Sequence, residues 1–151
     1  DTGYAQLIEE IDKTEGSKPI AVIFNLGVND LGNAGNYVSY MTSIASTLKS
    51  KNCKLFYMSV NPVNSTMITK TGRGARTEAQ VREFNSKIRS GLYKYIDMYS
   101  VLMKKGYGTN ARYDGVDDGD DGLHYTTKTF KRIYYYCITY LNTGSINASY
   151  Y

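Results

Sequence analysis

The feature that most constrains the fold is a short apolar run that stops abruptly at a glycine and two polar residues. Residues 20–24 are Ile-Ala-Val-Ile-Phe, and a nearly continuous apolar segment rich in β-branched side chains is typical of a strand buried on both faces of a parallel sheet. Gly27 then permits a tight turn, and Asn29 and Asp30 follow it. Because ligands bind at the carboxyl edge of open α/β sheets, Asn29 and Asp30 are the first candidates for a functional site.

These two side chains have different expected roles. A carboxamide at a strand end can donate an N–H group to a developing oxyanion, so Asn29 is a candidate oxyanion donor. A carboxylate can accept backbone N–H groups, so Asp30 is expected to brace the loop.

Helices and strands are predicted to alternate along the whole chain. Apolar spacing predicts helices at about 4–12, 36–48, 77–92 and 127–141, strands at about 54–60 and 93–99, and a helical turn at about 101–105. Thr77 is the expected N-cap of its helix. Residues 64–76 are expected to form an exposed loop, and residues 106–122 an irregular loop rich in Gly and Asp. This order predicts an α/β fold, a three-layer α/β/α sandwich around a parallel sheet, with residues 1–142 as one domain and residues 143–151 as a tail.

Composition argues against several classes of protein. The 151 residues suffice for one domain with a real core. Lys and Arg number 18 against 14 Asp and Glu, but the basic residues are scattered, so neither nucleic acid nor a membrane surface is expected as a partner. No apolar stretch approaches the roughly 18 residues of a membrane span. Cys53 and Cys137 lie beside apolar runs and are expected to be buried free thiols, with a disulfide as the alternative.

The only histidine, His124, stands three residues after Asp121, ahead of the last predicted helix. A carboxylate that holds one ring nitrogen leaves the other nitrogen free to act as a general base. The ordinary alternative is a surface histidine beside a helix cap. Asp121 and His124 are separated from Asn29 by most of the length of the domain, yet both segments are expected at one edge of the sheet. The sequence therefore favours a catalytic pair.

These residues resemble the SGNH or GDSL hydrolases, a family of esterases with a flavodoxin-like α/β/α fold. Residues 27–30, Gly-Val-Asn-Asp, resemble the family's third block, whose asparagine donates to the oxyanion. Residues 121–124, Asp-Gly-Leu-His, resemble its fifth block, which supplies the Asp and His of the catalytic triad. Together with residues 59–63, 84–88 and 95–99, which resemble bacterial members, these blocks cover most of the chain. The resemblance implies a catalytic role for Asp121 and His124, an oxyanion role for Asn29 and supporting roles for Gly27 and Asp30.

The family's first block, Gly-Asp-Ser, carries the nucleophile, and this sequence has no such block. By the family pattern an N-terminal part with two strands is missing, and either Gly3 or a glycine ahead of Asp1 is the second oxyanion donor. The strand within residues 19–26 is then expected to have an unpaired edge, covered by a cleaved N-terminal segment, by a second copy of the chain or through aggregation.

No internal serine is expected to replace the missing nucleophile. The serines on predicted helices and strands do not lie on a strand-to-helix elbow that would expose Oγ beside the histidine, and structural roles are expected for all of them. These serines are Ser39, Ser43, Ser46 and Ser59. Since loss of a triad member typically lowers the rate by several orders of magnitude, the 151-residue chain alone is expected to be nearly inactive.

The expected function is a serine esterase that removes small acyl groups such as acetyl, with acetylated carbohydrate as a candidate substrate class. The substrate follows from the resemblance and from the 16 tyrosines, a residue common both at half-buried positions and on sugar-contacting surfaces. No cofactor or metal is expected, and a secreted or cell-surface location is expected. The alternatives are a non-catalytic carbohydrate-binding or interaction module with the same fold, and a flavodoxin-like ligand-binding domain, which the lack of a phosphate-cradling loop disfavours.

Two loop segments carry weaker signals. The aspartates of residues 114–121 suggest calcium, but a solvated acidic loop is the default because the final glutamate of an EF-hand loop is missing. Residues 72–76, Gly-Arg-Gly-Ala-Arg, lack the spacing of a phosphate loop and are predicted to be a flexible basic loop at the rim of the site.

Overall fold

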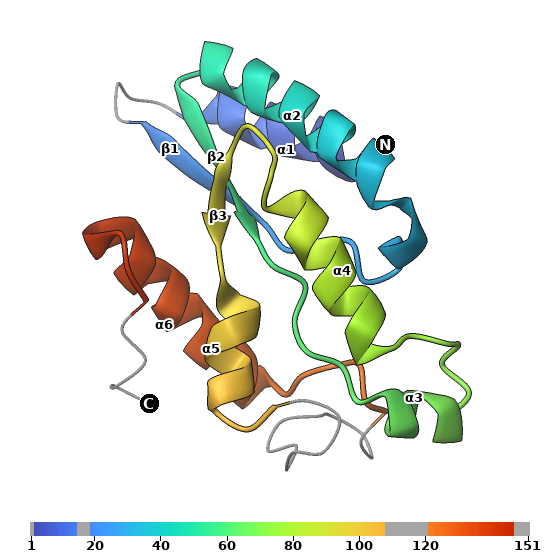
Figure 1. Ribbon diagram of the computed structural model, residues 1–151. Coiled ribbons are helices and arrows are strands. Elements are labelled where there is room, and N and C mark those ends of the chain that lie inside the picture. The colour runs from blue at the N-terminus through green and yellow to red at the C-terminus, as the bar shows by residue number, and fades with distance from the viewer. Residues whose placement is uncertain (1, 15–18, 108–120, 147–151) are drawn as a thin grey trace.

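The computed structural model describes residues 2–14, 19–107 and 121–146 and has a mixed α/β fold in which helices flank a three-stranded parallel sheet (Figure 1). The strands are β1 (Ile20–Phe24), β2 (Cys53–Met58) and β3 (Lys94–Ile96), in the spatial order β1-β2-β3. Since all three run in the same direction, their carboxyl ends lie at one edge of the sheet. The predicted parallel α/β arrangement is confirmed.

The helices begin where the sequence provides caps. Thr77 caps α4 in a reciprocal capping box with Gln80, and Thr126 caps α6. None of the helices in the described part of the chain is long and apolar enough to cross a membrane. Their bounds are α1 (Thr2–Lys13), the 3₁₀ turn η1 (Leu31–Asn33), α2 (Ala34–Ser50), α3 (Ser65–Lys70), α4 (Glu78–Ile88), α5 (Met98–Lys104) and α6 (Thr127–Thr143).

Side chains that alternate along β2 divide the core between the two faces of the sheet. Leu55 and Tyr57 pack with residues of α1, α2 and α4, whereas Phe56 and Met58 pack with residues of α5 and α6. The two cysteines are free and buried, as the sequence predicts. β2 is therefore the strand that is buried on both faces.

The prediction that β1 is buried on both faces is wrong. Only Val22 of this strand is buried, while Ala21 is exposed and the other three residues are half-buried. The reason is that β1 pairs with β2 on one side and with no other described strand on the other. Its outer edge therefore presents backbone N–H and C=O groups that a further strand would pair with.

The prediction of an exposed loop at residues 64–76 is wrong in part, because α3 lies within it. Asn64 caps this helix by accepting the Met67 N–H group at 3.1 Å, and Ile68 is fully buried. Its Ser and Thr residues favour turns as readily as helices, which conceals the helix in the sequence. The next predicted helix is also too long, because α4 ends at Ile88 and Leu92 is 81% exposed.

A buried side chain holds the chain just beyond β2. Asn85 of α4 is 6% exposed, its Nδ2 donates to the Val60 carbonyl oxygen at 2.9 Å, and its Oδ1 accepts the Val60 N–H group at 2.8 Å. Ser59 N donates to Ile96 O at 3.0 Å, and Ser59 Oγ accepts the Tyr99 N–H group at 2.7 Å. Ser59 thus has a structural role, and the segment leading from β2 to the sheet edge is fixed from both sides.

Replacing Asn85 with leucine should lower the free energy of unfolding by about 2–4 kcal/mol, because two hydrogen bonds are lost and the Val60 backbone groups are left buried without partners. Urea denaturation of the 151-residue chain measures this change. Ser86→Ala, at an exposed position on the same helix, is the control and should shift stability by less than about 0.5 kcal/mol. Equal stability of Asn85→Leu and the wild-type chain would show that the contact is dispensable.

Candidate active site

The loop after β1 turns sharply against the core. Gly27 has a φ of +112°, and a Cβ atom at this position would lie 2.5 Å from the Phe84 ring, so only glycine fits. The Tyr57 hydroxyl donates to the Leu26 carbonyl oxygen. This turn places Asn29, which is exposed, just beyond the carboxyl end of β1.

Asp30 braces this loop through its backbone. Its N–H group donates to the Gly27 carbonyl oxygen at 2.8 Å, and its own carbonyl oxygen accepts the Asn33 N–H group at 2.8 Å. The Asp30 side chain makes no capping hydrogen bond to η1. The bracing predicted for its carboxylate is therefore provided by main-chain atoms.

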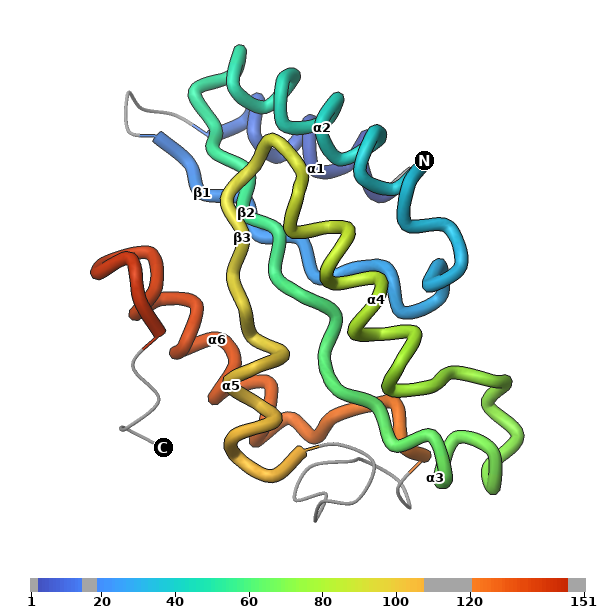
Figure 2. The backbone as a smooth tube through the Cα atoms, viewed as in Figure 1, coloured from blue at the N-terminus to red at the C-terminus, as the bar shows by residue number. Residues whose placement is uncertain are grey.

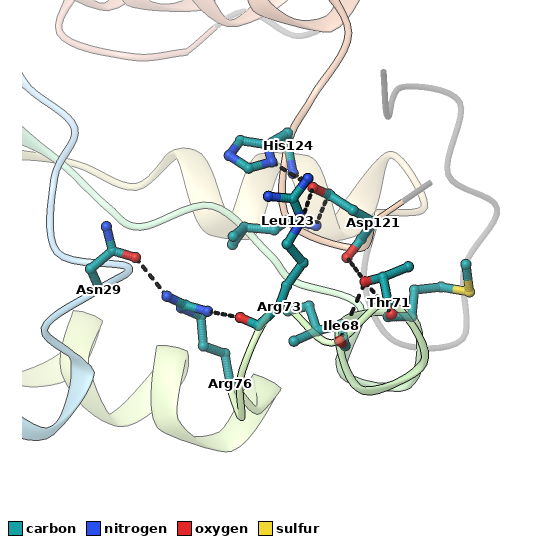
Figure 3. Close-up of polar contacts among 9 residues, drawn as sticks. Asn29, Ile68, Thr71, Arg73, Arg76, Asp121, Leu123 and His124 are labelled. Atoms are coloured by element: carbon teal, nitrogen blue, oxygen red, sulfur yellow. Dashed lines mark hydrogen bonds and ion pairs between the residues drawn. The ribbon is translucent and has the colours of Figure 1, made fainter. Parts of the chain in front are cut away.

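Asp121 and His124 form a hydrogen-bonded pair ahead of α6 (Figure 3). Asp121 Oδ2 lies 2.6 Å from His124 Nδ1, and Asp121 Oδ1 accepts the N–H groups of Leu123 and His124, each at 2.9 Å. The Asp121 side chain is 11% exposed and the His124 side chain 61% exposed. Because a carboxylate only accepts, Nδ1 carries the proton, and in this tautomer Nε2 is the acceptor nitrogen. This is the arrangement of a general base oriented by an acid.

The Asp121 carboxyl group is ionised at neutral pH. Burial would raise its pKa, but hydrogen bonds from the His124 amide, the His124 ring and the Leu123 amide outweigh burial and lower the pKa to about 2. Arg73 Nε lies 3.3 Å from Asp121 Oδ2, on a side chain that is 56% exposed. The charge that orients His124 is therefore present throughout the physiological pH range.

A close contact with α3 fixes the turn that carries this pair. Gly122 has a φ of +76°, and a Cβ atom there would lie 2.5 Å from the Asn64 carbonyl oxygen and 2.9 Å from the Ile68 amide nitrogen. Asn64 N donates to Gly122 O at 2.8 Å, and Thr71 Oγ1 donates to Asp121 O at 3.3 Å. In the chain trace of Figure 2 the segment that leads into α6 starts beside α3. The helix missed in the sequence is thus the support of the Asp121 turn.

A pocket of about 190 Å³ lies between the loop after β1, the segment that follows β2, and the segment that leads into α6 together with the first turn of that helix. Asn29 and His124 both line it, so the structure brings these two candidates to one place. No serine, threonine or cysteine is among the described residues that line it. Its apolar lining consists of Leu26, Val28, Val60, Val63, Leu123 and Phe130.

Arg76 holds the side chain of Asn29. Its terminal Nη2 donates to Asn29 Oδ1 at 2.7 Å, its Nε donates to Val28 O at 3.0 Å, and its Nη1 donates to Arg73 O. Since a guanidinium group has only donors, the carboxamide oxygen of Asn29 must face Arg76. The Nδ2 group then points away from Arg76 (Figure 3). Among the described residues no hydrogen bond engages its two N–H donors, so they can serve a bound group.

Other predicted residues lie elsewhere. Gly3 is exposed in the first turn of α1 and is not among the described residues that line the pocket. A second oxyanion donor therefore stays a prediction. Of the acidic loop, residues 114–120 lie outside the described residues, so the structure does not bear on their role.

A larger pocket, of about 650 Å³, lies at the opposite end of the strands, where Pro19, Cys53 and Lys94 are among its lining residues. It contains neither the Asp121 and His124 pair nor Asn29. Convergent polar groups and a shifted pKa mark functional sites better than volume does. The smaller pocket at the carboxyl edge is therefore the candidate active site.

The sequence does not reveal the two arginines at this site. It predicts residues 72–76 to be a flexible basic loop, whereas Arg73 contacts Asp121 and Arg76 contacts Asn29. Two arginines spaced by three in a polar loop are the only local signal, and that signal names no partner. The loop that connects the two halves of the site is visible only in three dimensions.

No protein-family model matches the sequence, and no curated protein matches it. A family assignment therefore depends on the short sequence blocks and on the geometry of the site.

The low pKa of Asp121 predicts how stability responds to acid. The folded pKa of about 2 lies below the reference value of 3.8, so the carboxylate stabilises the fold above about pH 4, and this contribution is lost as the pH falls from about 4 to about 2. Urea denaturation across this window should show the wild-type chain losing about 1–2 kcal/mol more than Asp121→Asn. Glu10→Gln, at an exposed position of α1, is the control. Identical acid dependence of wild type and Asp121→Asn would contradict the hydrogen bonding described.

Gly122→Ala should lower stability by about 2–4 kcal/mol and shift the NMR signals of the His124 ring, because it combines backbone strain with a clash against α3. Gly144→Ala is a matched control, since Gly144 has the same φ of +76° but no atom of the described residues within 4 Å of the added Cβ. This control should lose only about 1–2 kcal/mol and leave the ring signals in place. Equal effects of the two substitutions would show that the α3 contact yields without cost.

Proposed function

We propose that this chain is the carboxyl-terminal part of a serine esterase of the SGNH or GDSL type, acting on small acyl esters such as acetylated carbohydrates. One observation supports the proposal most. His124, hydrogen-bonded to the ionised Asp121, lines the same pocket as the carboxamide of Asn29. A base, its orienting acid and an oxyanion donor are three of the four groups that acyl transfer through a covalent intermediate requires.

The proposal includes a finer description of the fold, a flavodoxin-like three-layer α/β/α sandwich whose N-terminal strands lie outside this chain. In its favour, β1 is apolar enough for an interior strand but lies at the sheet edge. A segment carrying the nucleophile would pair with that edge and end beside Asn29. Asn61 also lines the pocket, and its buried Oδ1 has no hydrogen-bond partner among the described residues. A backbone N–H group of such a segment would satisfy an acceptor of this kind.

The mechanism follows from the roles of the three groups. Nε2 of His124 takes the proton of the serine hydroxyl as its oxygen attacks the ester carbonyl, and Asp121 stabilises the imidazolium that forms. The N–H groups of Asn29 donate to the oxyanion of the tetrahedral intermediate. The imidazolium then gives its proton to the leaving alcohol. In the second half of the reaction His124 takes a proton from water as the water attacks the acyl group, and the imidazolium returns that proton to the serine oxygen as the acid leaves. None of the described residues that line the pocket supplies a nucleophilic hydroxyl or thiol of serine, threonine or cysteine for the first step.

The shape of the pocket suits a small acyl group. Its volume of about 190 Å³ and its apolar lining favour acetyl over a long chain. Leu26 and Phe130 line it and are 51% and 50% exposed, so they offer an apolar surface to the alcohol part of the ester. This surface is consistent with the face of a sugar ring, which packs on aromatic side chains.

The rival function is a non-catalytic carbohydrate-binding or interaction module with the same fold. The observation that favours it is that no nucleophilic hydroxyl or thiol is among the described residues that line the pocket. The sequence encoded upstream of Asp1 separates the two functions, because a Gly-Asp-Ser block within about one strand-turn unit favours the enzyme.

The extended protein, with its upstream segment, should hydrolyse an aryl acetate, and His124→Ala should lower its turnover on the order of a thousandfold or more. The 151-residue chain should show little hydrolysis under the same conditions. Lys128→Ala, at an exposed position of α6, is the control and should keep full activity.

Two results would contradict the esterase. The first is failure of an extended protein with a Gly-Asp-Ser serine across a panel of aryl acetates and acetylated sugars. The second is an unchanged rate in His124→Ala. Either result would leave the binding module as the better explanation.

A further inference from the structure

We infer that Arg76 is a positioning residue for Asn29: it fixes the Asn29 carboxamide so that the N–H donors of this group face away from the arginine and toward the pocket. The catalytic meaning of this role rests on the proposed function. Arg76 does not line the pocket that contains His124. Its effect is therefore transmitted through Asn29 and not through contact with a reacting group.

The geometry of the guanidinium group carries the inference. All three of its nitrogens donate, to Asn29 Oδ1, Val28 O and Arg73 O. Two of these acceptors belong to adjacent residues of the loop after β1, Val28 and Asn29. The planar guanidinium group therefore holds the side chain of Asn29 and the backbone next to it at the same time. Arg76 thus contacts a residue that lies 47 positions earlier in the sequence.

Asn29 needs such a partner because it is exposed. The terminal torsion of an asparagine side chain is broad and roughly two-fold, so an unheld carboxamide would present its oxygen and its nitrogen to the pocket in turn. An oxygen turned toward a developing oxyanion would repel it. A donor-only partner on the oxygen selects the one orientation that helps.

The charge of Arg76 adds a second effect. A hydrogen bond from a cation to the amide oxygen is roughly twice as strong as a neutral one and draws electron density from the amide nitrogen. The N–H groups of Asn29 then become better donors to an oxyanion. Lysine would supply the charge but not the planar fork, so Arg76→Lys is expected to restore only part of the effect.

The first experiment follows the Asn29 side chain itself and needs no activity. In the ¹⁵N-labelled 151-residue chain, the Asn29 N–H₂ signals are assigned by their loss in Asn29→Ala. Their order parameter should be near the value of about 0.85 of rigid groups and should fall below about 0.6 in Arg76→Gln. Arg73→Gln is the matched control, because it removes an equal charge from the same loop while keeping the Arg73 carbonyl that Arg76 contacts.

The second experiment measures kinetics in the extended protein with its nucleophile. Arg76→Gln should lower kcat about tenfold to a hundredfold with KM little changed, which is less than the hundredfold to thousandfold expected for Asn29→Ala. The double variant should be no slower than Asn29→Ala, since both changes remove the same donor. Arg82→Gln, exposed on α4, should retain full kcat.

The outcomes separate this inference from the proposed function. An unchanged order parameter in Arg76→Gln, or losses in kcat that add in the double variant, would overturn the positioning role whatever the activity of the protein. A fall in the order parameter, with no hydrolysis by any form of the extended protein, would support the hold of Arg76 on Asn29 and overturn the esterase.

Discussion

The candidate site depends on the hydrogen bonds that the carboxylate of Asp121 accepts. A buried anion costs several kcal/mol unless hydrogen bonds satisfy it. Here one oxygen accepts two amides of its own turn, and the other contacts the ring of His124. The hydrogen bonds that keep Asp121 ionised therefore also form the turn and orient the ring of His124. Folding of this turn and orientation of the base depend on the same contacts. Arg73 adds little to this balance, because a side chain that is 56% exposed is screened by solvent.

The segments around the pocket are held by polar side chains that reach out from the core. Tyr57 donates to the loop after β1, Asn85 pairs with both backbone groups of Val60, and the hydroxyl of Tyr125 donates to Pro62 O at 2.5 Å. All three side chains are buried. Because β3 is short, the sheet itself ends before the pocket, and these contacts take the place of further strand pairing. The pocket is thus supported by buried interior groups, although most of its lining residues lie in loops.

How much of the fold and of the candidate site can be predicted from the sequence depends on how far apart in the sequence the interacting residues lie. The bounds of β1, the capping role of Thr77 and the contact between Asp121 and His124 follow from periodicity and from side chains within a few positions, so the sequence predicts them. The exposure of β1, the support of Gly122 by α3 and the hold of Arg76 on Asn29 are contacts between distant segments, and no local pattern encodes them. Gly3 is not among the described residues that line the pocket, so the second oxyanion donor, Gly3 or a glycine ahead of Asp1, stays a prediction from resemblance alone.

On the proposed function, the unpaired edge of the described sheet and the missing nucleophile have one structural origin, because β1 is the edge strand among the described residues and leads into the loop that carries Asn29. A strand that pairs with β1 in parallel places its own carboxyl end at the same edge of the sheet as the loop that carries Asn29, since parallel strands share the direction of their ends. Pairing would also cover the half-buried apolar side chains of β1 and stabilise the folded chain by mass action. On the proposed function, completion of the sheet and completion of the site are therefore thermodynamically linked: whatever tightens pairing at β1 also raises the population of molecules in which the added strand ends at the edge that carries Asn29 and His124.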